Sequence, residues 1–404
     1  MMAENKNIPE IRFAGFTDPW EQRKLGDMGT TFTGLSGKTK DDFGHGDARF
    51  VTYMNVFTNP VSDPDRVEAV EIDKSQDAVQ YGDVFFTTSS ETPEEVGMSS
   101  VWLENTDNIY LNSFCFGYRP TEKIDPHYMA YMLRSEAVRK KIIYLAQGIS
   151  RCNISKNGVM QIEVPVPNIN EQRLVGEYFS NLDSLITLHQ RKYDRLKNVK
   201  KSMLEKMFPR DGANVPEIRF AGITDAWEQR KLGEIFEEYS EKGHPELPAL
   251  TIIQGGGTIR RDESDRSLQY DKASLANYKM VNDGDFIVHL RSFEGGLEKA
   301  TTLGIISPAY HTFHGEGTDS RFYYSYFRSP KFIDQDLKPH VYGIRDGRSI
   351  DIEGMKTIEI PWTSFDEQKA IGDYIDALDN LITLHQRKAR EVKKCQRPLY
   401  ECIF

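Results

Sequence analysis

The chain has 404 residues, and 51 Lys and Arg against 61 Asp and Glu give a net charge of −10. With 39% hydrophobic residues it can form packed cores, which excludes a disordered or collagen-like chain, and its acidic balance excludes a histone-like protein. The length favours roughly two to three domains. Four scattered cysteines, no membrane-length apolar run and no apolar signal segment in Met1 to Glu10 predict a cytoplasmic protein without disulfides.

The chain begins with a segment that it later repeats. Residues 8–27 read IPEIRFAGFTDPWEQRKLGD and residues 215–234 read VPEIRFAGITDAWEQRKLGE, with sixteen of twenty positions identical. A second pair, residues 171–192 and 367–388, is identical at fourteen of twenty-two positions. The offsets of 207 and 196 residues are too long for a solenoid repeat of roughly 20–50 residues. We therefore interpret the chain as a tandem duplication of a whole domain, alike at its edges and diverged inside.

The first variable region is predicted to mix strands and helices. Runs at 49–56, 84–88 and 109–118 are strand-like, and 127–145 is helical. One polar loop follows the second strand, and Arg134, Arg139, Lys140 and Lys141 lead into another at 147–156. Arg, Asn, Gln and Ser can bind base edges or phosphates, and the alternative is a solvated surface turn. The candidate DNA-binding residues here are Thr88, Ser89, Ser90, Gln147, Ser150, Arg151, Asn153 and Lys156.

The next element is a long conserved helix. Apolar residues recur at spacings of three and four from residue 171 to 208, which predicts a coiled-coil helix about 57 Å long if it has about 38 residues. The repeat predicts a second such helix, although Pro398 should kink or end it near Arg397. His189 and His385 are equivalent polar positions that either set the register or sense protons. The residues expected in the helix pairing or in partner docking are Leu182, Leu185, His189, Leu196, Leu378, Leu381, His385 and Val392.

The second variable region lies between these helices and is also predicted to be mixed. Strand-like runs occupy 286–290 and 357–361, and residues 320–338 are helical. Gly255-Gly256-Gly257 lacks the lysine of a phosphate-binding loop, so we expect a mobile loop there. A basic loop at 340–349 occupies the place of 147–156 in the first copy. The candidate DNA-binding residues are Arg260, Arg261, His289, Arg291, Ser292, Tyr342, Arg345 and Arg348.

No catalytic constellation is present in the sequence. The phosphate-binding GxxxxGK[ST] loop, the GxSxG nucleophile turn and the Asn-Pro-Pro-aromatic run of adenine methyltransferases are all missing. His311 and His314 have the HxxH spacing of half a metal site, but no further ligand lies at convincing zinc spacing, so we expect a structural or solvated pair. We therefore predict a non-enzymatic α+β protein without a metal, with domains at 1–165 and 211–365, a spacer helix at 166–210 and a C-terminal helix at 366–404.

Together the PEIRFAG…WEQRKLG blocks, the IEVPVPNINEQ and IEIPWTSFDEQ segments and the LITLHQRK helices resemble the specificity (S) subunit of type I restriction-modification systems. The resemblance implies two target recognition domains, each reading one half of a split DNA sequence, separated by an antiparallel spacer with pseudo-two-fold symmetry. It also implies two methyltransferase (M) subunits that use S-adenosylmethionine at adenine N6, and restriction (R) subunits that cut DNA with ATP and Mg. The S subunit itself would need no cofactor.

Two other interpretations of the sequence remain. One is a coiled-coil scaffold with two protein-binding heads and no DNA recognition. The other is a stand-alone nuclease or methyltransferase, which the missing cofactor and metal motifs disfavour.

Overall fold

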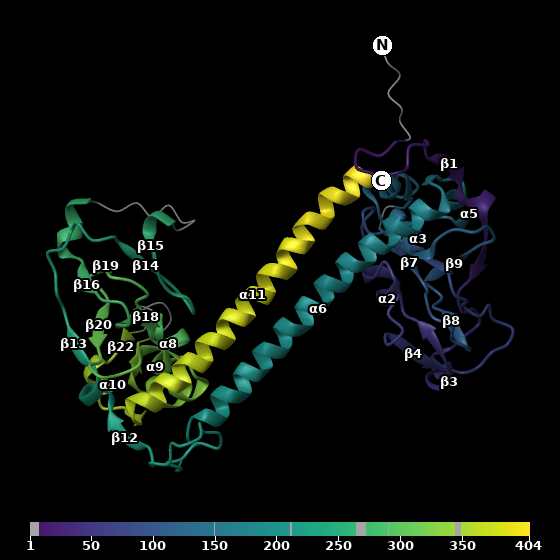
Figure 1. Ribbon diagram of the computed structural model, residues 1–404. Helices are drawn as coiled ribbons and strands as arrows, with labels where there is room; N and C mark the ends of the chain where they lie inside the picture. Colours follow the sequence, from purple (N-terminus) through teal and green to yellow (C-terminus); the bar gives the residue numbers. More distant parts are fainter. Residues whose placement is uncertain (1–7, 149, 211, 264–271, 290, 344–348) are drawn as a thin grey trace. The chain divides into compact units, whose positions relative to one another are not determined.

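The structure is a computed structural model that describes residues 8–148, 150–210, 212–263, 272–289, 291–343 and 349–404. The chain divides into two units, Met1–Gln190 with Arg387–Phe404, and Arg191–Gln386. In each unit the strands lie beside an end of the long helices α6 (Ile169–Met207) and α11 (Phe365–Ile403) (Figure 1). Each long helix therefore begins in one unit and ends in the other.

The first unit is built mainly from residues that precede the middle of α6. Its elements are β1 (Glu21–Lys24), α1 (Leu25–Met28), β2 (Gly29–Thr33), η1 (Lys40–Asp42), β3 (Phe43–Val51), α2 (Tyr53–Thr58), β4 (Val67–Val70), β5 (Val84–Thr87), β6 (Ser89–Ser90), β7 (Ser99–Val101), β8 (Ile109–Leu111), β9 (Cys115–Pro120), α3 (Pro126–Met132), α4 (Glu136–Tyr144), β10 (Cys152–Asn153), α5 (Lys156–Met160) and β11 (Glu163–Val166).

The second unit follows the end of α6. Its elements are β12 (Glu228–Lys231), α7 (Leu232–Ile235), β13 (Glu237–Tyr239), β14 (Leu250–Ile253), β15 (Gly257–Arg260), η2 (Arg261–Glu263), η3 (Lys272–Asn277), β16 (Lys279–Val281), β17 (Phe286–Val288), α8 (Ser292–Gly295), β18 (Glu298–Lys299), β19 (Gly304–Ile306), β20 (His311–His314), α9 (Ser320–Phe327), the π-helical η4 (Phe332–Leu337), η5 (Lys338–His340), β21 (Val341–Tyr342), β22 (Ser349–Ile350), α10 (Ile352–Lys356) and β23 (Glu359–Trp362).

The two units share one plan. The first has a four-stranded antiparallel sheet in the order β2-β9-β5-β7, and the second has β13-β20-β17-β18 in the same arrangement. A two-stranded ladder closes each domain, β1 with β11 and β12 with β23, in the same register. The segments between the first two strands of the chain in each sheet differ: β3, α2 and β4 lie there in unit 1, and the β14–β15 hairpin lies there in unit 2. The predicted α+β fold with two long helices is confirmed.

Four of the predicted elements are interrupted in the structure. The strand expected at 49–56 ends at Val51 and is followed by α2, and the helix expected at 320–338 ends at Phe327 before η4 begins. The strand expected at 109–118 is two strands, because the side chain of Asn112 accepts a bond from the amide of Phe114 (2.9 Å) and turns the chain between β8 and β9. The helix expected at 127–145 is also divided, because α3 ends at Met132 and Ser135 caps the start of α4. Capping residues inside an apolar periodic run therefore marked breaks that the periodicity alone did not.

Helix α11 does not end near Pro398, because it continues through the proline to Ile403. Aromatic packing at the end of the helix offers a physical reason. The ring of Tyr400 lies 4.3 Å from that of Phe179, and Phe404 packs edge-on against Trp20 at 6.4 Å. These contacts hold the last turn in the core of unit 1 although proline donates no backbone hydrogen bond.

Replacing Pro398 by alanine should raise the free energy of unfolding of unit 1 by about 1–3 kcal/mol, since a proline inside a helix costs about 3 kcal/mol relative to alanine. Thermal unfolding of the two proteins measures the gain. The neighbouring, exposed Arg397→Ala is the control and should stay within about 0.5 kcal/mol of the parent. An unchanged or lower unfolding temperature for Pro398→Ala would mean that the helix accommodates the ring without strain.

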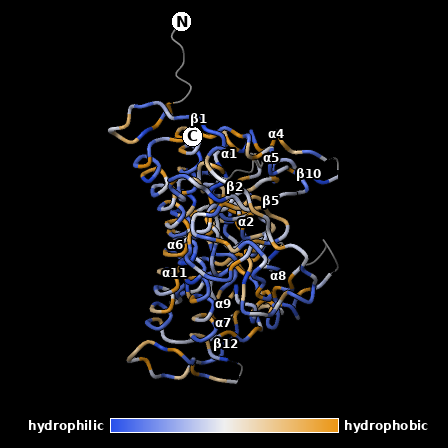
Figure 2. Tube along the Cα trace, turned by 90° about the vertical axis from the view of Figure 1, so that its right-hand side faces the viewer, coloured by the Kyte–Doolittle hydropathy of each residue, from blue (hydrophilic) through white to orange (hydrophobic). Residues whose placement is uncertain are grey.

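The buried stripe of the long helices differs from the predicted one at alternate positions. Leu185 and Leu381, expected inside, are each 43% exposed, and the following residues, Ile186 and Ile382, are partly buried in their place. Hydrophobic and hydrophilic residues alternate along both helices (Figure 2), and two adjacent apolar residues fit the heptad equally well on the sequence. The remaining predicted positions, Leu182, His189, Leu196, Leu378, His385 and Val392, are partly or fully buried.

Antiparallel pairing of the helices occurs within each unit. In unit 1 the side chain of Gln396 donates to Asp183 (2.6 Å), and in unit 2 Lys200 pairs with Asp379 (2.6 Å). Both pairs join an early position of one helix to a late position of the other. The expected helix pairing is therefore present in each unit.

Candidate nucleic-acid interface

In unit 1 the structure brings the two predicted polar loops together. Strand β6 pairs antiparallel with β10, with Ser90 opposite Cys152 and Ser89 opposite Asn153. The backbones of Gln147 and Asn153 exchange two hydrogen bonds of 2.9 and 2.8 Å. Residues 147 and 153 are thus joined to each other, and Asn153 lies alongside β6.

The exposed members of this group are Gln147, Ser150, Arg151 and Asn153. The hydroxyls of the neighbouring strand are instead used inside the unit: Thr88 donates to the carbonyl of Phe114 (2.8 Å), and Ser90 donates to Glu95 (3.0 Å). Ser89 and Ser90 are buried and Thr88 is half-buried. These three residues are therefore part of the packing around β6 and β10 rather than free side chains beside Gln147 and Asn153. Lys156, the first residue of α5, is half-buried.

Helix α2 joins this cluster, which the sequence did not indicate. The hydroxyl of Tyr53 donates to the carbonyl of Ser89 (2.9 Å), and Thr52 caps the helix. Inside the segment, the buried side chain of Asn55 donates to the carbonyls of Asp63 (2.7 Å) and Arg66 (3.0 Å). Tyr144, at the end of α4 and three residues before Gln147, is 90% exposed. An exposed aromatic ring beside a polar loop suits stacking on a base or sugar.

Two members of the predicted basic cluster point inward. Arg134 donates to backbone carbonyls of Ser99, Val56, Phe57 and Asn59, and Arg139 donates to those of Glu94, Val96 and Gly97. Burial lowers the pKa of each guanidinium to about 10, so both remain cationic at neutral pH. Arg134 and Arg139, grouped with Lys140 and Lys141 on the sequence, are therefore not available to DNA, because their donors are occupied by backbone carbonyls of the chain itself.

In unit 2 the glycine-rich segment is the tip of the β14–β15 hairpin. Gln254, Gly255 and Gly256 connect the strands and are exposed. Arg260, at the end of β15, is exposed and pairs with Asp262 (2.9 Å). Arg261 donates to the hydroxyl of Tyr278 and the carbonyl of Leu250, both at 3.3 Å. Arg260 is thus the more accessible of the two predicted arginines.

The hairpin tip is held by a buried carboxylate that the sequence did not indicate. Glu298 on β18 is fully buried and accepts from the amides of Gly255 (2.7 Å) and Gly257 (3.1 Å). It also accepts from the hydroxyl of Tyr324 (2.7 Å) and pairs with Arg328. The tip is therefore fixed to the sheet, and the expected mobile loop is a structured turn.

The residues predicted after β17 differ from one another in accessibility. Ser292, the first residue of the short α8, is buried, and its hydroxyl accepts a hydrogen bond from the amide of His289 (2.9 Å). Burial lowers the pKa of His289, so the imidazole is neutral at pH 7 and carries no charge for a phosphate. Arg291 is exposed, as is Tyr342 on β21 at 59%. Arg345 and Arg348 lie outside the described residues.

The duplicated edges of the sequence meet in space within each unit. Arg12 makes a two-bond ion pair with Glu171 in unit 1 (2.6 and 2.8 Å), and Arg219 does the same with Glu367 in unit 2 (2.7 and 2.8 Å). The residue after each glutamate is a glutamine that accepts a backbone amide of the variable domain. Gln172 accepts from Asp125, which caps α3, and Gln368 accepts from Asp319, which caps α9. The repeated motifs therefore join each variable domain to its long helix.

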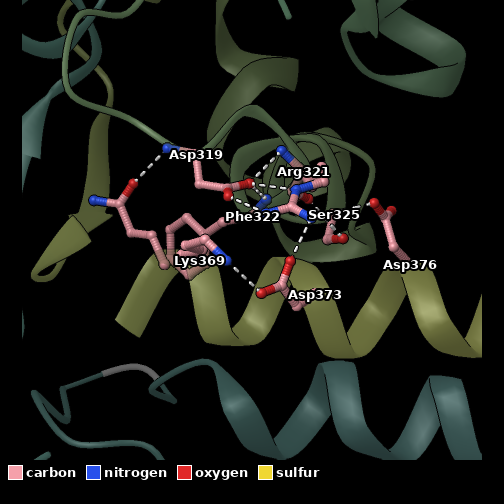
Figure 3. Close-up of polar contacts among 8 residues, drawn as sticks. Asp319, Arg321, Phe322, Ser325, Lys369, Asp373 and Asp376 are labelled. Atoms are coloured by element: carbon pink, nitrogen blue, oxygen red, sulfur yellow. Dashed lines mark hydrogen bonds and ion pairs between the residues drawn. The ribbon is translucent and has the colours of Figure 1, made fainter. Parts of the chain in front are cut away.

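A charge cluster reinforces this joint in unit 2. Arg321 on α9 donates to Asp319 (2.5 Å) and to Asp373 on α11 (2.6 Å), and Asp376 lies 3.5 Å away (Figure 3). Lys369 pairs with the same Asp373 at 2.8 Å (Figure 3). The cluster fixes the start of α9 to the side of α11.

Arg321→Gln should destabilise unit 2 by about 1–2 kcal/mol, because it removes charge-assisted bonds that are only partly exposed. Denaturant unfolding at low and high salt measures the loss, which should shrink in high salt. Lys369→Gln is the matched control: it loses an exposed pair to the same Asp373 and should cost at most about 0.5 kcal/mol. Equal losses for the two variants would contradict a special role for Arg321.

Within the described parts of the chain there is no cluster of three His, Cys, Asp or Glu that could hold a metal ion. His311 and His314 pair instead with Glu238 and Asp285, each at 2.7 Å. Among the described helices none has both the length and the apolar character needed to cross a membrane.

Known proteins are similar to this chain over almost its whole length. Residues 17–198 match the family model of the type I restriction modification DNA specificity domain. The chain is 22% identical over 427 residues to a Methanocaldococcus jannaschii protein described as the type I restriction enzyme MjaX specificity subunit, covering 99% of this chain and 96% of that one. It is 21% identical to the MjaVIII specificity subunit of the same organism, with the same coverage.

A solved structure shares the fold. The S subunit of a type I restriction-modification system from M. genitalium superposes with a TM-score of 0.61 at 13% identity, covering 98% of this chain and 99% of that one. The family model matches only the first copy of the duplication. The second copy has the same sheet order and the same closing ladder as the first.

Proposed function

We propose that the chain is a specificity subunit of a type I restriction-modification system and that it reads a bipartite DNA target, one half with the variable domain of each unit. The observation that carries this proposal is that the two variable domains share a sheet but differ in the segments inserted into it. Both units have the same four-stranded sheet, yet different segments project from it. Two domains with the same sheet and different inserted segments are suited to reading two unrelated half-sites.

The contacts with DNA would come from the exposed residues of the two polar surfaces. In unit 1 these are Gln147, Ser150, Arg151 and Asn153, with Tyr144 beside them. In unit 2 they are Arg260, Arg291 and Tyr342. Arginine suits guanine edges, and Asn and Gln suit adenine. The net charge of −10 is compatible with this role if partner subunits supply most phosphate contacts.

Methylation and cleavage would be carried out by partner subunits. Two methyltransferase subunits would dock on the like edges of the two units and supply S-adenosylmethionine chemistry at adenine N6. Leu185 and Leu381, equivalent in the duplication and each 43% exposed, are apolar groups suited to such docking. Restriction subunits using ATP and Mg would cleave DNA that lacks the methyl groups.

Expression of the chain with its methyltransferase subunit, in a host without adenine methylation, tests the proposal. N6-methyladenine mapped across the host genome should reveal one motif made of two short half-sites with a fixed gap. The methyltransferase expressed alone is the control and should leave the motif unmodified. Absence of methylation from a complex shown to be assembled and cofactor-loaded would favour the scaffold with two protein-binding heads.

Arg151→Glu should lower methylation by roughly tenfold or more, because one good base contact contributes about 1–3 kcal/mol and the substitution adds repulsion from phosphates. The rate of methyl transfer to an oligonucleotide carrying the mapped motif is the measurement. Lys123→Glu makes the same charge change at an exposed position near the closing ladder of unit 1 and should have little effect. Similar losses for the two variants would point to a general charge effect rather than a local contact.

A further inference from the structure

Arg134 and Arg328 occupy the same place in the two variable domains. Each lies just beyond the helix that begins after a capping aspartate, Asp125 or Asp319, and each is followed by serine. The separation of 194 residues is the same for the capping aspartates and for the arginines (319 − 125 and 328 − 134). The interiors of the domains have otherwise diverged, so a shared arginine there calls for a shared task.

In unit 1 Arg134 ties the variable segment to the sheet. Its Nε donates to the carbonyl of Ser99 on β7 at 2.6 Å, and its Nη2 donates to carbonyls at the end of α2. Those acceptors are Val56 (2.8 Å), Phe57 (3.1 Å) and Asn59 (2.9 Å). A guanidinium suits this task because its donors form a rigid fork and its charge attracts the carbonyl end of a helix. Lysine could not bond strand and helix in the same way.

In unit 2 Arg328 serves the same sheet edge through an intermediary. It pairs with Glu298 on β18, the strand equivalent to β7, and Glu298 accepts the amides of Gly255 and Gly257. Tyr324 donates to the same carboxylate at 2.7 Å. A side chain at Gly255 would reach within 3.0 Å of the Arg328 guanidinium, so the arginine also lies directly against the turn.

Both arginines therefore join the edge strand of the sheet to the segment that differs most between the domains. Their donors are directed at the protein itself, which leaves them poorly placed to bind bases. The segments that they hold lie next to exposed groups: α2 is bonded to Ser89, opposite Asn153, and the hairpin carries Arg260. A shift of about 1 Å in such groups can cost about 100-fold in rate.

We propose that Arg134 and Arg328 are positioning residues for sequence selectivity, each fixing the DNA-reading surface of its own unit and leaving the other unit unaffected. The inference rests on the proposed reading of DNA. It assigns selectivity to two side chains that do not touch the DNA. Their substitution should alter which bases are accepted in one half-site, in addition to any change in stability.

The test compares methylation motifs of complexes containing the whole chain. Arg328→Lys and Glu298→Gln should each make positions of one half-site degenerate, and Arg134→Lys should do so in the other. The expected size is a roughly tenfold fall in discrimination between cognate and altered half-sites, with the partner half-site read as before. Arg321→Lys is the matched control, since Arg321 lies at the start of α9, the helix that Arg328 follows, but bonds α11. It should leave both half-sites unchanged.

Two further results separate a positioning role from a structural one. Complex assembly and thermal unfolding are measured for every variant, and a merely structural arginine would lower yield or unfolding temperature while the residual methylation kept the parent motif. That outcome would overturn the inference. A parent complex that shows no bipartite motif would instead refute the proposed function.

Discussion

Replacing Glu367 by alanine is expected to destabilise the second unit by about 3–5 kcal/mol, since it leaves a buried positive partner uncompensated. The carboxylate is fully buried and binds three side chains. Arg219 pairs with it at 2.7 Å, the indole N–H of Trp227 donates to it at 2.9 Å, and Thr363 donates to the same oxygen. Denaturant unfolding of the parent and the variant measures the loss. Because this ion pair links the variable domain to α11, the variant should unfold in one cooperative transition at a lower denaturant concentration than the parent.

The same carboxylate makes stability depend on pH. Burial alone would raise the pKa of Glu367, but Arg219, Thr363 and Trp227 outweigh burial and hold the pKa below its ordinary value. The unfolded chain therefore binds a proton at a higher pH than the folded one. The contribution is fully present above the ordinary glutamate pKa and disappears as the pH falls through the lower pKa of the folded state.

Glu353→Ala is the control for both effects. Its side chain is 83% exposed and pairs only at the surface with Lys356, so its loss should cost at most about 0.5 kcal/mol. Glu367→Gln keeps the shape and should remove most of the pH dependence that Glu367 contributes. If the parent and Glu367→Gln lost stability in parallel on acidification, Glu367 would not be the group responsible.

Exchanging residues 228–366 for those of a specificity subunit with a different target should recode one half of the methylated motif completely and leave the other half unaltered. The boundaries follow from the structure. They keep both strands of the β12–β23 ladder together within the exchanged piece. They retain Arg219, Trp227 and Glu367 as a host joint. A motif map of the chimaeric complex is the measurement.

The donor must place a backbone amide where that of Asp319 donates to Gln368 of the host at 3.0 Å. A donor with an apolar residue in the place of Arg321 provides a useful second chimaera. Its exchanged domain should be held less firmly to α11, but the expected motif is the same. Changes in both half-sites would mean that the two units do not read independently. A complex that assembles and methylates nothing would mean that the piece carries more than recognition.

The sequence predicted the parts of the fold that depend on local pattern and repetition. The long helices, the duplication and the α+β class came from periodicity and identity over many residues. The choice between Leu185 and Ile186 for the buried face failed because adjacent apolar residues satisfy the same heptad. The break between α3 and α4 was not predicted, because the capping hydroxyl of Ser135 outweighs the helical periodicity of the run.

The candidate site was harder to predict because its parts meet through long-range pairing. The loops near Ser89 and Asn153 were found as separate polar segments, but their adjacency depends on the ladder of β6 with β10. Whether an arginine points inward depends on backbone carbonyls brought together by the fold. The sequence does not show these carbonyls, so Arg134 was grouped with surface cations. Glu298 had no local signal at all, since its partners lie about 40 residues earlier and about 30 later.

Unit 1 is completed by residues 387–404, which are made after the whole of the second unit. Tyr400 and Phe404 cover the aromatic cluster of Trp20, Tyr128 and Phe179, so this core stays open during translation until the last turns of α11 emerge. At about 5–20 residues per second, synthesis of the intervening unit takes roughly 10–40 s. The second unit is contiguous and can close first. The N-terminal unit is therefore the one exposed to chaperones, proteases and premature termination, and a ribosome that stalls before Tyr400 leaves it unfinished.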